Sequence, residues 1–148
     1  ADRLENKIIP ALQAGFIVLS DRYFYSIIAR DSIRGIDKNW SRSLYGIALR
    51  PHLVLYLKAS IPSLVQRLIH GRGLNYWESG MDLHFADNFY DSFVIYQTQV
   101  LKELEELARE YNFITIDADR TPSEIFEDLK RPIRLLLHNR LTKSERPF

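Results

Sequence analysis

The sequence contains no cysteine, which excludes disulfide bonds, thiolate metal sites and cysteine nucleophiles. It also lacks a long apolar run, because stretches such as residues 53–57 fall far below the roughly 20 residues of a membrane-spanning helix. Charged side chains at positions 2, 3, 5 and 7 interrupt the N-terminus, which therefore does not read as a signal peptide. These absences predict a cytoplasmic protein with no membrane partner.

An excess of charge of one sign is absent as well. Twenty Lys and Arg residues stand against nineteen Asp and Glu residues, so the formal net charge is +1 and no overall field favours nucleic acid. The four histidines lack the paired spacing of a metal site, and Ser26 has no histidine nearby to activate it. With 46% hydrophobic residues among 148, the chain predicts a globular domain with a core.

Short apolar runs alternate with helical patterns along the chain. Residues 16–19, 53–57 and 113–116 are predicted to be buried strands, because they are rich in aliphatic and β-branched side chains. Apolar side chains at helical spacing, together with capping residues, predict five helices. These helices are expected at residues 3–14 with a bend at Pro10, at 40–50, at 62–69, at 93–111, and from 121 until Pro132 kinks or ends the last one. This alternation predicts an α/β fold with a parallel sheet flanked by helices.

The predicted domain covers residues 1–138, and residues 139–148 read as a polar tail. A doubly wound sheet of only three strands that opens on a helix would leave its edges exposed and one face poorly covered. We therefore expect the fold to be incomplete at its N-terminus.

The strongest candidate for chemistry follows the first predicted strand. In parallel sheets, ligands bind outside the carboxyl ends of the strands, and Ser20, Asp21, Arg22 and Tyr23 come directly after residues 16–19. An aspartate beside an arginine could hold a magnesium ion or a water on one side and a phosphoryl oxygen on the other. A buried Asp-Arg pair that only fixes a turn is the structural alternative.

Five segments in order resemble the thymidylate kinase family, whose members phosphorylate dTMP. They include Ala1-Asp2-Arg3 and Asp21-Arg22-Tyr23, and the matches lie at residues 1–5, 9–15, 19–23, 50–57 and 116–118. The resemblance implies a P-loop NTPase-like fold, ATP as phosphate donor with Mg²⁺, cytoplasmic nucleotide biosynthesis and a homodimer.

The resemblance also implies roles for individual residues. Asp21 would act beside the magnesium ion and the γ-phosphate and could contact the metal. Arg22 would hold the monophosphate of dTMP and the transferring phosphoryl group. Arg3 would hydrogen-bond the thymine ring. Arg67 and Arg72 would belong to a lid over ATP. The substrate pocket would comprise Arg3, Arg22, Tyr23, Ser26, Arg30 and Asp31.

Two departures from the family pattern stand out. Arg30-Asp31 replaces a Tyr-Gln pair, which leaves the preferred base open. No Gly-x-x-x-x-Gly-Lys-Ser/Thr loop occurs to cradle the phosphates of ATP, so we expect a C-terminal fragment that turns over nothing by itself.

Two other functions remain open on the sequence. One is a different P-loop deoxynucleotide or nucleoside kinase. The other is a non-catalytic module for single-stranded nucleic acid, which the near-neutral charge disfavours. That module would use basic and aromatic side chains at positions 22, 23, 25, 30, 34 and 40.

Overall fold

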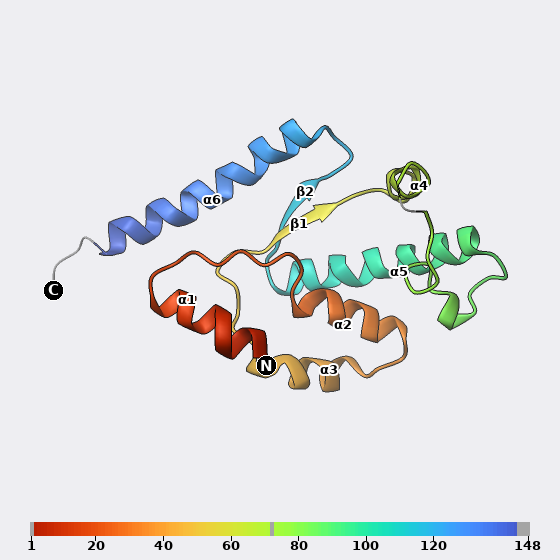
Figure 1. Ribbon diagram of the computed structural model, residues 1–148, viewed down its shortest axis with the longest axis horizontal. Helices are drawn as coiled ribbons and strands as arrows, with labels where there is room; N and C mark the ends of the chain where they lie inside the picture. Colours follow the sequence, from red (N-terminus) through yellow and green to blue (C-terminus); the bar gives the residue numbers. More distant parts are fainter. Residues whose placement is uncertain (1, 72, 145–148) are drawn as a thin grey trace. The chain divides into compact units, whose positions relative to one another are not determined.

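The computed structural model describes residues 2–71 and 73–144, with side chains described as far as residue 139. The chain divides into two compact units, one ending at Arg50 and one beginning at Pro51. Figure 1 labels the helices and strands of each unit. No helix in the described part of the chain is both long and apolar enough to cross a membrane.

The N-terminal unit begins with a helix of two kinds. A π-helical turn, Leu4–Ile8, leads into α1, Ile9–Gln13, and the Ile9 N–H donates to the Leu4 carbonyl five residues back. Pro10 lies two residues beyond the end of the π-helical turn, and it has no N–H to donate to that turn. Gly15, at φ 82°, turns the chain after the helix. The predicted helix at residues 3–14 is thus confirmed, with its first part a π-helical turn and Pro10 the second residue of α1.

Two further helices form the core of this unit. Helix α2 spans Phe24–Ile33 and buries Tyr25, Ile28 and Ala29. Helix α3 spans Lys38–Leu44, capped by the Asp37 carboxylate, which accepts from the Trp40 N–H at 2.8 Å. A 3₁₀ turn, Tyr45–Ile47, follows. The α-helix predicted for residues 40–50 therefore ends at Leu44.

The strand predicted for residues 16–19 is not present. The side chains of Phe16, Ile17 and Leu19 are 68%, 77% and 91% exposed, and the segment forms no strand. A strand exists only where its backbone groups pair with a neighbour, and in the described residues the only sheet pairs β1 with β2. High β-propensity is therefore not enough to make this segment a strand.

The second unit contains that sheet. Strands β1, Leu55–Lys58, and β2, Ile114–Asp117, pair in parallel, with Leu55 opposite Ile114 and Lys58 opposite Asp117. Helices α4, Ile61–Ile69, and α5, Phe89–Glu110, separate the strands in sequence, and a short 3₁₀ turn, Met81–Leu83, lies between them. The two strands predicted in this unit, at residues 53–57 and 113–116, are confirmed within two residues. The α/β fold with parallel strands and flanking helices is confirmed as well.

Helix α5 supplies most of the core of this unit. Its buried apolar side chains, at helical spacing along one face, are Phe93, Tyr96, Val100 and Leu107. The loop before α5 is fixed to the helix, because the buried Ser92 hydroxyl donates to the Ser79 carbonyl at 2.7 Å. On the polar side, Lys58 on β1 forms an ion pair with Glu105 at 2.6 Å. The apolar stripe predicted for this helix is confirmed.

Helix α6 spans Pro122–Ser144 and contains Pro132 in its interior. Proline removes one backbone hydrogen bond, yet here the helix continues on both sides of it. Pro132 therefore does not end the helix. Residues 139–144, predicted as part of a polar tail, continue α6, and residues 145–148 lie outside the described part.

Gly80 is a position where an added side chain would clash with the core of this unit. Its φ is +66°, and an added Cβ would lie 2.7 Å from Cγ of the buried Tyr96. We predict that Gly80→Ala lowers the free energy of unfolding by about 3 kcal/mol, through backbone strain and overpacking. Gly73→Ala is the control, because Gly73 also has a positive φ but no atom within 4 Å of its Cβ position. That variant should lose about 1 kcal/mol in urea unfolding. Equal losses would contradict the steric explanation.

Candidate functional site

The residues predicted to form the site fall into both units. Arg3, Asp21 and Arg22 belong to the N-terminal unit, whereas Arg67 lies on α4 of the second unit. Arg72, predicted as the other lid residue, lies outside the described residues.

A groove in the N-terminal unit brings Arg3 and Asp21 together. It is lined by Arg3, Lys7 and Ile8 from the first helical segment and by Ser20 and Asp21 from the turn after residue 19. Arg3 and Lys7 are one helical turn apart, so both cations can reach the same ligand. A carboxylate on one wall and two cations on the other suit a phosphate that carries a metal ion.

The turn at residues 20–22 holds Arg22 in an unusual backbone conformation. Arg22 has φ 62°, in the left-handed region, and the Ser20 hydroxyl donates to its carbonyl at 2.8 Å. Such strain in a residue other than glycine occurs often at functional sites. Asp21 and Arg22 are both exposed, so the alternative of a buried pair is wrong. The premise that a paired strand delivers them is also wrong, since residues 16–19 form none.

Tyr23 and Ser26 lie at the start of α2. Tyr23 precedes the helix with extended backbone, and the Ser26 hydroxyl donates to the Tyr23 carbonyl at 3.0 Å. Partial burial raises the pKa of Tyr23, which therefore stays neutral at physiological pH. Its ring lies 4.8 Å from that of Phe24. These contacts order the chain directly after Arg22.

The two residues that depart from the family pattern lie later on α2. The Asp31 carboxylate accepts from the hydroxyl of Ser41, a residue only 1% exposed, at 3.1 Å. This contact ties α2 to α3. Burial, followed by the charge of Asp31, raises the pKa of Tyr45. The backbone carbonyl of Arg30 accepts from the guanidinium of Arg34 at 3.5 Å. The structure thus gives Asp31 a packing role within the unit.

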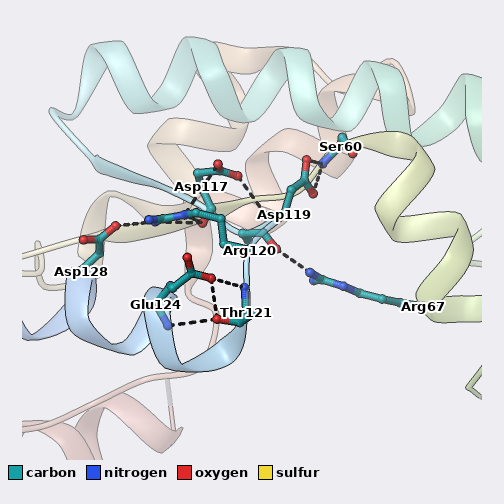
Figure 2. Close-up of polar contacts among 9 residues, drawn as sticks. Ser60, Arg67, Asp117, Asp119, Arg120, Thr121, Glu124 and Asp128 are labelled. Carbon is teal, nitrogen blue, oxygen red and sulfur yellow. Dashed lines mark hydrogen bonds and ion pairs between the residues drawn. The ribbon is translucent and has the colours of Figure 1, made fainter.

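In the second unit, polar side chains gather after the carboxyl ends of β1 and β2, as Figure 2 shows. The Ser60 N–H, two residues beyond β1, donates to both carboxylate oxygens of Asp119, at 3.0 and 3.1 Å. Arg67 reaches the same loop, where its Nη2 donates to the Ala118 carbonyl at 2.5 Å. Parallel pairing brings these strand ends to one edge, which is the usual place for a ligand.

The other side of this loop is tied to α6. Arg120 pairs with the Asp128 carboxylate and lies 3.4 Å from the Asp117 carbonyl. Thr121 and Glu124 form the predicted capping box, since the Thr121 N–H donates to Glu124 at 3.0 Å and the Glu124 N–H to Thr121 Oγ1 at 3.4 Å. Asp119, Arg120 and Asp128 were not predicted as site residues, although Asp119-Arg120 directly follows the matched segment at 116–118.

Three carboxylates in this cluster are stabilised in their charged form. Hydrogen bonds from Ser60 and Ser63 lower the pKa of Asp119, and hydrogen bonds from Thr121 lower the pKa of Glu124. A hydrogen bond from Arg120 lowers the pKa of Asp128. All three are therefore ionised at neutral pH. In the described residues, no three His, Asp or Glu side chains are grouped so as to hold a metal ion by themselves.

These shifts predict an acid-dependent loss of stability. A carboxyl with a lowered pKa in the folded protein contributes stability above its unfolded pKa, near 4, and loses it as the pH falls through the folded value. We expect Asp128→Asn to reduce the drop in unfolding free energy between roughly pH 5 and pH 2.5. Asp87→Asn, outside the cluster, is the control. Carboxyl ¹³C titration giving ordinary values for Asp119, Glu124 and Asp128 would contradict the shifts.

Comparison with known proteins assigns the chain to a family. The family model for thymidylate kinase matches residues 1–129. A probable thymidylate kinase 2 from Saccharolobus solfataricus is 31% identical over 143 residues, which cover 95% of this chain and 67% of that protein. A probable thymidylate kinase from Thermococcus gammatolerans is 44% identical over 77 residues, 50% of this chain and 36% of that protein.

A third relative, a probable thymidylate kinase from Methanocaldococcus jannaschii, is 32% identical over 125 residues, 84% of this chain. The chain spans 67%, 36% and 57% of the length of these three relatives. The match over residues 1–129 includes the groove of the N-terminal unit and the polar cluster after β2. The chain therefore belongs to the thymidylate kinase family.

Proposed function

We propose that the protein to which this chain belongs transfers the γ-phosphoryl group of ATP to dTMP. The observation that carries the proposal is the family match over residues 1–129, which includes Asp21-Arg22-Tyr23. In this reaction a phosphate oxygen of dTMP attacks the γ-phosphorus, the bond to the β-phosphate oxygen breaks, and ADP leaves as dTDP forms. Such a transfer depends on positioning and on neutralising charge, so no side chain needs to act as a nucleophile.

The groove of the N-terminal unit supports binding of the acceptor. Arg3 and Lys7 supply cationic donors along one wall, and Asp21 faces the same groove. Arg22, exposed and held at φ 62°, follows directly and would place its guanidinium on the monophosphate and on the transferring group. Arg3 would donate to a carbonyl of the base. Tyr23, Ser26, Arg30 and Asp31 would shape the rest of the acceptor pocket.

Asp21 fits a magnesium ion that is held mainly by phosphates and water. Mg²⁺ usually keeps several water ligands and takes only one or two carboxylates from the protein. Asp21 is an exposed carboxylate on the groove, so it can provide such a contact directly or through water. The bound ion would neutralise charge on the phosphates. Arg67 would contact ATP in the second unit.

The cellular setting forms part of the proposal. The absence of cysteine and the family membership support a protein that acts in the cytoplasm. A homodimer is proposed from the family resemblance. Sedimentation of the full-length protein tests the dimer.

Arg22 offers the sharpest test of the proposed function. In the full-length protein, Arg22→Met should lower kcat/KM for dTMP-dependent ADP formation by at least about 100-fold. The substitution removes the positive charge of the guanidinium that would neutralise the transferring phosphoryl group. Arg134→Met, an equivalent change on the exposed side of α6, is the control and should stay within about twofold of wild type.

The measurement is a coupled assay with dTMP, dUMP, dCMP and dGMP as acceptors, which also establishes the preferred base. Circular dichroism verifies that both variants fold. Wild-type protein that forms no ADP with any nucleotide, or an Arg22→Met variant with near-normal turnover, would refute the proposal. Salt-sensitive binding to oligonucleotides without binding to mononucleotides would favour the nucleic-acid module instead.

A further inference from the structure

Two contacts, both with the donor on the α4 side, connect α4 to the loop that follows β2. The Ser60 N–H, immediately before α4, donates to both carboxylate oxygens of Asp119, and Arg67 near the end of α4 donates to the Ala118 carbonyl. Figure 2 shows both contacts. The partners are 59 and 51 residues apart in sequence, so each contact connects distant parts of the unit. Together they attach α4 to the loop at two points along the helix.

Asp119 has an environment that favours its charge. Ser60 is the N-cap of α4, with its hydroxyl accepting from the Ser63 N–H at 3.4 Å, so the carboxylate lies beside the N-terminal end of a nine-residue helix, where the helix dipole favours negative charge. The Asp119 N–H donates in turn to Asp117 Oδ1 at 2.9 Å. The aspartate is therefore held by its backbone at the end of β2 while its side chain holds α4.

Fixing the start of α4 also constrains Arg67. Ser60 and Arg67 lie seven positions apart, which corresponds to about 10 Å along a rigid helix. Arg67 points from α4 toward the loop after β2, at the edge where both strands end (Figure 2). If the helix were released at Ser60, it could rotate or slide, and the Arg67 guanidinium would move with it.

We propose that Asp119 is a positioning residue for the phosphate donor, which it serves by anchoring α4 so that Arg67 is held at the strand ends. Asp119 itself touches no reacting atom. The inference rests on the proposed function, because it takes Arg67 as a contact of ATP. It predicts that replacing Asp119 weakens binding of the donor ATP and leaves binding of the acceptor dTMP unchanged.

The test compares Asp119→Ala, Asp119→Asn and Asp128→Ala in the full-length protein. Asp128→Ala removes the Arg120 partner on the α6 side of the same loop and leaves the α4 side intact. Asp119→Ala should raise KM for ATP roughly tenfold, with kcat and KM for dTMP within about twofold of wild type. Asp119→Asn keeps one acceptor oxygen for the Ser60 N–H and should recover part of the loss. Asp128→Ala should leave KM for ATP within about twofold.

Hydrogen exchange of the Ser60 amide provides a readout that does not depend on turnover. Exchange should accelerate in Asp119→Ala and remain at the wild-type rate in Asp128→Ala. Equal rises of KM for ATP and dTMP, or the same rise of KM for ATP in Asp128→Ala, would show a general loosening of the loop and overturn the positioning role.

The failure of this inference and that of the proposed function are distinguishable. If the wild-type protein forms no ADP with dTMP, the proposed function fails, and calorimetric titration with Mg-ATP then decides the inference. A dissociation constant for Mg-ATP that is roughly tenfold weaker in Asp119→Ala supports the positioning role. An unchanged dissociation constant overturns it.

Discussion

Parallel pairing of β1 with β2 is the constraint on which the second unit depends. The pairing continues past the strands, since the Ala118 N–H donates to the Lys58 carbonyl at 2.8 Å. Both strands therefore end at the same edge of the sheet, where the Ser60 N–H donates to the Asp119 carboxylate. Without this register, the backbone donor of one loop and the carboxylate of the other would not come within hydrogen-bonding distance. Helix α5 supports the arrangement by burying Tyr96 and Leu107 in the core.

Hydrogen bonds from backbone N–H and hydroxyl groups hold two of the three carboxylates in the polar cluster at this edge, and an ion pair with Arg120 holds the third. The main cause of the lowered pKa of Asp119 is the hydrogen bond from the Ser60 backbone N–H, and that of Glu124 is the hydrogen bond from the Thr121 hydroxyl. Exposed ion pairs contribute little to stability, whereas backbone donors fix the direction as well as the charge of a carboxylate. The loop after β2 thus has a defined conformation although it is exposed to solvent. A defined loop is what a nucleotide site at strand ends requires.

The groove of the N-terminal unit depends on a helical segment and a turn, without a paired strand among the described residues of this unit. It is lined by a π-to-α helical segment and by residues 17–21, and the next residue, Arg22, adopts a left-handed backbone conformation. The Ser20 hydroxyl stabilises that turn by bonding to the Arg22 carbonyl. The Asp31 carboxylate, meanwhile, is engaged with Ser41. This contact connects α2 to α3 within the unit.

The sequence by itself determined the elements whose signals are local. Apolar spacing predicted α5, β-branched runs predicted β1 and β2, and Thr121 with Glu124 predicted the start of α6. The motifs at Arg3 and at residues 21–23 also predicted the family. Tertiary structure alone decided which partners these residues have. Residues 16–19 resemble a strand yet form none, because pairing requires a neighbour that local propensity cannot reveal. Asp119 meets Ser60 only because two strands far apart in sequence lie side by side.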